Sequence, residues 1–228
     1  MAKKRKQPAE GGGDVELAVV RVFCGEGGEG GNELGVVVNG AAVPPDDRQA
    51  LARHLGYAET VFVDDAETGR VRIFTPAIEL PFAGHPVVGT GWLLRQRGHS
   101  AKRLLTPAGA VELRHEDKLT WATGEVDWCP PFELVELGSA DEVEAAQPAT
   151  EGWQYLWAWT DEDAGHIRSR CFVPEAGIVE DEATGSAALR LADALDCEIT
   201  VKQGRGSVIQ ARPVGEDRVE IGGRVELA

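Results

Sequence analysis

The sequence predicts an α+β fold built from two similar domains, because each half of the chain follows the same plan. In each half, strand-like segments lead to a loop of small residues, the loop opens an apolar helix, and further strands follow. This repeat predicts an N-terminal domain at 15–108 and a C-terminal domain at 109–228, and the basic run and glycines of residues 1–14 predict a disordered tail before them. The last strands of the C-terminal domain are free to pack on the first domain.

In the first half, apolar and alternating segments predict strands at 15–23, 34–38, 60–63 and 70–74. Between the second and third of these strands, Asp46 is expected to cap a short helix that ends at Gly56. In segment 82–95, small residues and Pro86 run into an apolar stretch that stops at Gly98. We therefore expect a tight loop that enters a buried helix.

The second half is expected to hold one apolar helix, which follows the loop at 184–187 and runs to about Leu195. Segment 133–152 is charged and contains proline and several alanines, so we expect it to be the loosest part of the chain and a surface excursion. Strands are expected near Val111 and at 119–122, 153–159, 167–173, 207–212 and 218–221.

The composition indicates a globular, acidic protein. A hydrophobic fraction of 43% can supply a core, and no apolar run approaches the roughly 20 residues that span a bilayer. The net charge of −15 repels polyphosphate, so a nucleic-acid partner is not expected, and without an apolar span a membrane partner is not expected either. The basic run at residues 3–6 fits a nucleic-acid or targeting arm, but a solvated tail is the favoured interpretation.

The cysteines and the N-terminus bear on compartment and metal binding. Cysteines at positions 24, 129, 171 and 197 stand too far apart for a metal knuckle or a redox motif, so no metal site is expected. The N-terminus does not lead into the apolar stretch of a secretory signal. A reducing cytoplasm is the simplest expectation.

A glycine-rich loop at residues 25–30 matches the G-x-G-x-x-G pattern of dinucleotide-binding proteins. That pattern needs a helix directly after it, because the pyrophosphate sits on the helix N-terminus. Here a β-branched, strand-like run follows, and Glu26 and Glu29 would repel phosphate. We expect a connection between two strands, and no cofactor.

The two small-residue loops at 83–89 and 184–187 are candidates for ligand binding. Small residues let backbone N–H groups approach a ligand closely, and helix N-termini attract anions. Facing each other, the loops would hold a small carboxylate-bearing molecule in a cleft between the domains. Ordinary close packing of the loops explains the same residues equally well.

Three titratable residues are candidates for catalysis. Glu59 lies among apolar neighbours, and desolvation would favour its neutral form and suit it to acid–base work. Taken alone, however, the residues favour a glutamate on an edge strand that faces water. His85 fits a structural loop histidine as well as a catalytic one, and Asp181 could merely cap the second helix.

Taken in order, these segments resemble the phenazine-biosynthesis PhzF-type isomerase family, which is related to diaminopimelate epimerase. The most specific matches are Phe-Thr-Pro followed by Glu-Leu-Pro-Phe-Ala-Gly-His-Pro-Val-Val-Gly-Thr, and Gly-Ile-Val-Glu-Asp-Glu-Ala-Thr-Gly-Ser-Ala. The resemblance runs from about residue 15 to the C-terminus. The matching segments are 31–38, 58–63, 74–90, 170–174, 177–187, 203–207 and 222–223.

The resemblance implies two similar diaminopimelate-epimerase-like domains, each a barrel-like sheet around a central helix, with the active site between them. It implies a cofactor-independent isomerase that acts on a small carboxylate, and it is compatible with a homodimer. In the type member, the reaction isomerises a dihydro-hydroxyanthranilate. By resemblance, Glu59 moves a proton between carbon centres, and His85 and Asp181 are its polar partners. The substrate-binding residues that it implies are Gly84, Thr184, Gly185 and Ser186.

The chain also departs from the family pattern. Glu182 stands where the family usually has proline, which adds a negative charge near the expected anion site, and Glu33 likewise replaces a proline. Ala83 and Thr184 occupy the positions of the two cysteines in the related amino-acid epimerase, so a two-thiol mechanism is not expected. The second half is short for the family. These departures keep an alternative open, a non-catalytic protein that binds a small carboxylate or serves as an interaction module.

Overall fold

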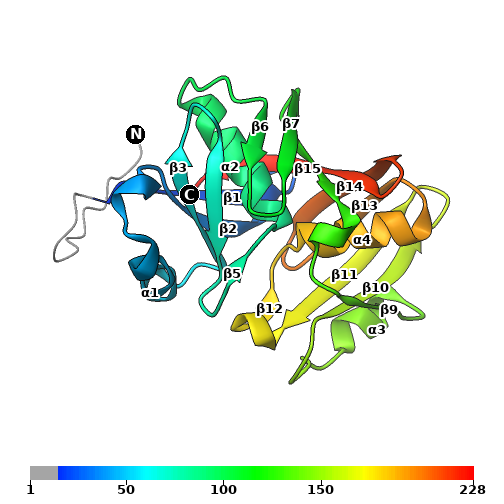
Figure 1. The fold of residues 1–228 in the computed structure, drawn as a ribbon. Helices are drawn as coiled ribbons and strands as arrows, with labels where there is room; N and C mark the ends of the chain where they lie inside the picture. Colours follow the sequence, from blue (N-terminus) through cyan, green and yellow to red (C-terminus); the bar gives the residue numbers. More distant parts are fainter. Residues whose placement is uncertain (1–14) are drawn as a thin grey trace.

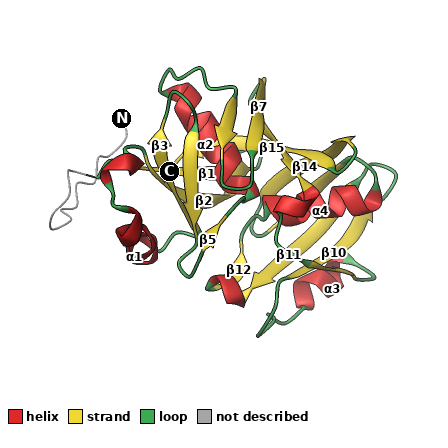
Figure 2. Ribbon diagram, viewed as in Figure 1, coloured by secondary structure: helices red, strands yellow, loops and turns green. Residues whose placement is uncertain are grey.

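In a computed structural model of the chain, residues 15–228 are described, and the predictions for the basic tail lie outside them. The described chain is dominated by one mixed sheet with helices packed on it (Figures 1 and 2). The helices are α1 (Pro45–Leu55), α2 (Gly84–Gln96), α3 (Ala140–Ala145) and α4 (Gly185–Leu195). The strands are β1 (Leu17–Cys24), β2 (Gly30–Val37), β3 (Glu59–Asp65), β4 (Arg70–Phe74), β5 (Glu79–Leu80), β6 (Arg103–Leu105), β7 (Ala110–Glu116), β8 (Leu119–Glu125), β9 (Glu133–Glu136), β10 (Gln154–Asp161), β11 (His166–Val173), β12 (Ile178–Asp181), β13 (Ile199–Gln203), β14 (Ser207–Gly215) and β15 (Arg218–Leu227).

The first part of the sheet closes into a ring around α2. Its strands follow the order β1-β2-β3-β4-β6-β7-β8-β15, and β15 pairs back onto β1. Helix α2 contacts strands all round this ring, and nearly all of its side chains are buried. The buried helix expected in segment 82–95 is therefore confirmed (Figure 1).

The second part of the sheet continues from the ring without a break. Strand β14 pairs with β15, and the sheet then runs through β13, β11, β10 and β9. Helix α4 packs on β14 and β15, and its inner residues are buried. Two sheet regions, each with one buried helix, confirm the predicted α+β class. Strands β7, β8 and β15 from beyond residue 108 complete the first ring, and the proposed division of the chain at 108/109 stays a prediction.

The segment predicted to be a loose excursion, 133–152, holds regular structure. Strand β9 pairs in parallel with β10, and α3 is capped by Ser139, whose hydroxyl accepts from the Glu142 N–H at 3.2 Å. Arg170 ties this segment down by donating to the carbonyl oxygens of Glu144 at 2.9 Å and Ala146 at 2.8 Å. The segment does lie at the surface, as expected, but it is not loose, because Arg170 on another strand anchors it.

The cap predicted for α1 is also wrong. Pro44 occupies the N-cap without a side-chain hydrogen bond, and Asp46 lies in the first turn. The helix is held instead by Arg48, which donates to an Asp64 carboxylate oxygen at 2.6 Å. Gly56 ends the helix in the left-handed conformation, φ 73°, as predicted.

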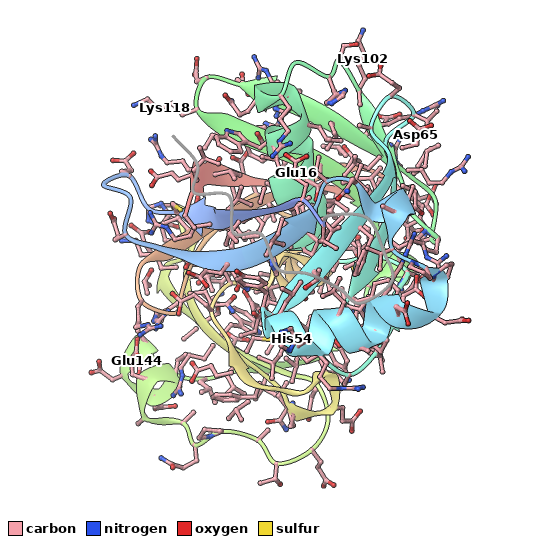
Figure 3. All side chains as sticks on the ribbon, turned by 90° about the vertical axis from the view of Figure 1, so that its left-hand side faces the viewer. Glu16, His54, Asp65, Lys102, Lys118 and Glu144 are labelled. Carbon is pink, nitrogen blue, oxygen red and sulfur yellow. The ribbon has the colours of Figure 1, made fainter. Side chains whose placement is uncertain are left out.

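The glycine-rich loop joins two strands, as expected. Residues 25–29 form the turn between β1 and β2, where the Gly25 N–H donates to the Glu29 carbonyl at 2.8 Å. All four cysteines are free thiols. Figure 3 shows Lys102 and Lys118 on the outside at one end of the molecule and Glu144 on the outside toward the other. Within residues 15–228, we find no helix with the length and apolar character that crossing a membrane requires.

The two buried helices meet at their N-termini, where the ring and the second part of the sheet adjoin. The Gly84 N–H of α2 donates to the Ser186 hydroxyl of α4 at 3.1 Å. The backbones touch here, because a Cβ on Gly84 would lie 2.6 Å from the Gly185 carbonyl carbon. This contact fixes the two small-residue loops against each other.

Gly84→Ala is expected to lower the free energy of unfolding by about 1–3 kcal/mol, the usual cost of overpacking a filled site. The added methyl would meet backbone, which cannot turn aside as a side chain can. Gly215→Ala is the control, because a Cβ there meets no atom within 4 Å and its φ is not positive. The control should change stability by less than about 0.5 kcal/mol. Urea unfolding measures both, and equal losses in the two variants would contradict the close contact.

Candidate active site

The structure brings the three predicted titratable residues together at the junction of the two helices. Glu59 is the first residue of β3, His85 the second of α2 and Asp181 the last of β12. Their exposed fractions are only 7%, 2% and 5%, so the interpretation of Glu59 as a water-facing edge residue is wrong. Glu59 and Asp181 line one cavity together with Thr184 and Ser186. His85 Nε2 lies 3.4 Å from Glu59 Oε2.

Asp181 is fixed by hydrogen bonds to both of its carboxylate oxygens. Asn32 on β2 donates from Nδ2 to Oδ1 at 2.6 Å, and the Thr184 hydroxyl donates to Oδ2 at 2.6 Å. Donors on both oxygens favour the ionised form of a carboxyl group. They also leave Asp181 little freedom to turn within the cavity.

Glu59 has the opposite surroundings. Its Oε2 and the facing His85 Nε2 are both buried without a hydrogen-bond partner among the described residues. Burial raises the pKa of Glu59 well above its ordinary value, and the negative charge of Asp181 raises it further. Burial lowers the pKa of His85 to about 3. At neutral pH the imidazole is therefore uncharged, and its contact with Glu59 is not an ion pair.

Glu59 and Asp181 influence each other's ionisation, but their surroundings favour different protonation states. Burial raises the pKa of Asp181 too, but its bonds from Thr184 and Asn32 act against that rise. Two carboxyl groups close together in a dry site do not both ionise readily, so they tend to share one proton. The hydrogen bonds favour the charged form of Asp181, whereas burial and the nearby charge of Asp181 favour the protonated form of Glu59.

Sequence reasoning gave no role to two buried polar residues, Asn32 and Gln203. Gln203 Nε2 donates to the Asp181 carbonyl at 2.8 Å and to the Thr184 hydroxyl at 2.9 Å. Its Oε1 accepts from the Thr184 N–H at 3.2 Å. Both residues lie inside the motifs that carry the resemblance, which was the available signal. Together they fix the turn between Asp181 and α4.

The four residues expected to bind substrate lie together at the two helix N-termini. Two of their amides already have acceptors within the protein, since the Gly84 N–H donates to Ser186 and the Thr184 N–H to Gln203. The first amides of an α-helix have no acceptor within that helix. The first turn of α4, starting at Gly185, is thus the part of this cluster best suited to an anionic group.

The cavity is small and mainly apolar. Its volume is about 20 Å³, which is room for about one water molecule. Phe132 and Trp153 form part of the wall and pack edge to face, with ring centroids 5.5 Å apart. The remaining wall residues are Thr75, Leu80, Ala83, Pro130, Val173, Ala176 and Ile178. A ligand larger than water therefore requires these walls to separate.

A larger hollow of about 940 Å³ lies elsewhere, beside the β1–β2 turn. It mixes acidic groups such as Glu26 and Glu29 with basic groups such as Lys202 and Arg224, and it contains none of the predicted site residues. Buried carboxyl groups with raised pKa values are the stronger sign of chemistry, so the small cavity is the candidate site. Among residues 15–228, no cluster of three or more His, Cys, Asp or Glu side chains is arranged to hold a metal ion.

Comparison with known proteins agrees with this arrangement. The family model PhzC-PhzF, described as phenazine biosynthesis-like protein, matches residues 20–154 and 134–217. The trans-2,3-dihydro-3-hydroxyanthranilate isomerase of Pseudomonas fluorescens is 33% identical over 203 residues, which cover 71% of this chain and 73% of that protein. An isomerase of Pasteurella multocida without an assigned reaction is 30% identical over 207 residues, 71% of each chain.

Solved structures show the same fold. A PhzC/PhzF protein of Clostridium difficile superposes with a TM-score of 0.75 at 21% identity, over 93% of this chain and 96% of that one. A hydroxyproline epimerase of Agrobacterium vitis superposes with a TM-score of 0.62 at 12% identity, over 93% and 90%. The family model and the sequence relatives go further than the fold: the chain belongs to the phenazine biosynthesis-like PhzC-PhzF family and is an isomerase of that family.

Proposed function

We propose that the protein moves a proton between two carbon atoms of a small carboxylate, without a cofactor, and that Glu59 is its acid and base. One observation carries the proposal. A buried carboxyl group with an unengaged oxygen, whose surroundings favour its protonated form, shares a cavity with a second carboxyl group that accepts hydrogen bonds on both oxygens. Pairs of titratable groups whose surroundings push their pKa values apart are typical of acid–base sites.

The resting protonation state suggests the order of events. Protonated Glu59 first gives its proton to one carbon of the substrate's double-bond system, which forms a new C–H bond. The resulting carboxylate then takes a proton from a second carbon, whose C–H electron pair restores a double bond at a new place. Glu59 is again protonated, so the cycle is balanced and consumes no other reagent.

The surroundings of Glu59 support this cycle. With the substrate seated between them, the mainly apolar walls around Glu59 would keep the proton from escaping to solvent between the two transfers. The neutral His85 ring lies against Glu59 and limits the directions in which its carboxyl can point. The charge held on Asp181 favours the protonated form of Glu59 and so restores the acid after each turnover.

The walls of the cavity suggest the substrate class. No lysine or arginine lines it, so a single carboxylate would be bound by the first amides of α4 and the Ser186 hydroxyl. The apolar walls, with the Phe132–Trp153 pair, suit an unsaturated carbon skeleton. The Pseudomonas fluorescens relative is named for a substrate that is a dihydro-hydroxyanthranilate, a ring that carries one carboxylate. We expect a small cyclic or amino-acid-like carboxylate here.

Glu59→Gln is expected to lower turnover by about 100- to 10,000-fold, because glutamine cannot hold or return the proton. Asp181→Asn should lower it less, since Asp181 orients and polarises the site but does not itself carry the transferred proton. The assay screens cyclic and amino-acid-like carboxylates in deuterated water and follows deuterium incorporation by mass spectrometry.

Glu67→Gln is the matched control for this experiment, because Glu67 lies on the turn after the same strand and its side chain is 81% exposed. It should exchange at the wild-type rate. Exchange at the wild-type rate in Glu59→Gln, together with its loss in Asp181→Asn, would assign the proton to the wrong carboxyl group. If the wild type exchanges none of the candidates, a non-catalytic carboxylate-binding protein becomes the better hypothesis.

Glu59→Gln is also expected to change how stability depends on pH. Because burial raises the pKa of Glu59, the folded protein keeps this proton at pH values where the unfolded chain, with a pKa of about 4.3, has lost it. The group's contribution to stability is then fully present below pH 4.3 and is lost as pH rises toward the folded pKa. Each unit between the two pKa values corresponds to about 1.4 kcal/mol.

Between pH 5 and pH 8, the free energy of unfolding of the wild type should therefore fall relative to that of Glu59→Gln. Urea unfolding at the two pH values measures this difference, and Glu136→Gln, at an exposed glutamate that ends strand β9, serves as the control. A difference between Glu59→Gln and wild type that stays constant with pH would mean that Glu59 ionises normally in the folded protein.

A further inference from the structure

Glu182 follows Asp181 directly, yet its side chain points away from the cavity and is not part of its lining. Its Oε1 accepts from the Arg205 N–H at 2.6 Å and from the Ser207 hydroxyl at 3.1 Å. Arg205 Nε also lies 3.6 Å from the second carboxylate oxygen, but the Arg205 side chain is 94% exposed. An ion pair so open to solvent contributes little, so the two hydrogen bonds define the contact.

The turn between β13 and β14 is shaped around this carboxylate. Gly204 adopts a positive φ of 55°, and a Cβ on it would collide with the Glu182 carboxyl group. A residue with a side chain would both strain the backbone and displace Glu182. The close fit distinguishes Glu182 from an ordinary surface glutamate.

The contact of Glu182 leads back to Asp181 by a second route. The Ser207 oxygen that donates to Glu182 accepts from the Gly31 N–H of β2 at 2.8 Å. Gly31 directly precedes Asn32, whose side chain donates to Asp181 at 2.6 Å. The bonds therefore close a cycle that joins the ring of strands to the loop carrying Asp181.

We propose that Glu182 is a positioning residue for Asp181, which it holds against Asn32 by linking strand β2 to the end of strand β12 through Ser207. The importance of this position for catalysis rests on the proposed function, but the hydrogen-bonded cycle does not.

Glu182 also acts on Asp181 by its charge, which raises the Asp181 pKa. The other titratable groups that face Asp181 favour their neutral forms. Burial raises the pKa of Glu59 on β3, of Cys171 on β11 and of Tyr155 on β10. Burial likewise keeps the His85 imidazole on α2 uncharged, because it lowers the His85 pKa to about 3.

Glu180 precedes Asp181 and pairs with Arg170. The Arg170 Nε donates to Glu180 Oε1 at 2.7 Å, and Arg170 Nη2 donates to Glu180 Oε2 at 2.8 Å. Its negative charge is therefore partly compensated where it stands. Removing the charge of Glu182 should then shift the titration of Asp181 more than removing that of Glu180.

Two variants distinguish the effect of the Glu182 hydrogen bonds from the effect of its negative charge. Glu182→Gln keeps an oxygen that accepts from Arg205 and Ser207 but removes the negative charge, whereas Glu182→Ala removes both. Glu180→Gln is the matched control, because it removes an equal charge next to Asp181 without touching the Arg205–Ser207 turn. The probes are the carboxyl carbon of Asp181, titrated by NMR and assigned with Asp181→Asn, and the hydrogen exchange of the Gly31 amide.

We expect Glu182→Gln to lower the Asp181 pKa by more than Glu180→Gln does, while the Gly31 amide stays protected. In Glu182→Ala, the Gly31 amide should exchange faster as well. Turnover of Glu182→Ala should fall by about 10- to 100-fold, mostly in kcat, because a displacement of about 1 Å in a catalytic group can cost about 100-fold. Glu182→Gln should restore most of that turnover.

Unchanged protection of the Gly31 amide in Glu182→Ala would contradict the proposal that Glu182 positions Asp181 through Ser207. An Asp181 titration that Glu182→Gln shifts no more than Glu180→Gln does would overturn the effect of charge. Both NMR readouts are independent of turnover. A wild-type protein that exchanges no deuterium into any substrate would therefore speak against the proposed function alone.

Discussion

The site depends on the place where the N-termini of two buried helices touch. Gly84 and Gly185 allow the two backbones to meet, and the Gly84 N–H reaches the Ser186 hydroxyl across the contact. His85 and Ser186 directly follow these glycines, so the contact sets their separation. Since the ring and the rest of the sheet are continuous through β15 and β14, the helices are held from both sides. Residues from distant segments thereby share one dry cavity.

Within that cavity, hydrogen bonds rather than burial make the two carboxyl groups differ in how readily they ionise. Glu59 and Asp181 are both nearly inaccessible to water, so burial alone would leave both neutral. Asp181 receives donors on both oxygens from Asn32 and Thr184, while Glu59 keeps an oxygen without a partner. The difference between an acid that can move its proton and a fixed charge therefore comes from residues without titratable groups.

The sequence predicted the fold class and both buried helices, because small-residue loops and apolar stretches are local signals. The family resemblance predicted that Glu59, His85 and Asp181 share one site. The residues alone favoured a Glu59 that faces water. The roles of Asn32 and Gln203 escaped notice because the Asn32–Asp181 bond joins residues 149 positions apart. The regular structure in 133–152 was not predicted for a similar reason, since Arg170 anchors this segment from another strand. Long-range hydrogen bonds leave little trace in local pattern.

The same unpaired atoms that suit the site to proton transfer also burden the fold. A buried polar atom without a partner costs free energy, and Glu59 and His85 each contribute one. Their titrations oppose one another. Burial lowers the pKa of His85 to about 3, so its contribution to stability is lost as pH falls below the ordinary histidine pKa, whereas that of Glu59 is lost as pH rises. A fold selected for stability alone would replace both residues with apolar ones. Their presence side by side, in a cavity fixed by Asn32 and Gln203, is consistent with the proposed reaction, which needs one movable proton.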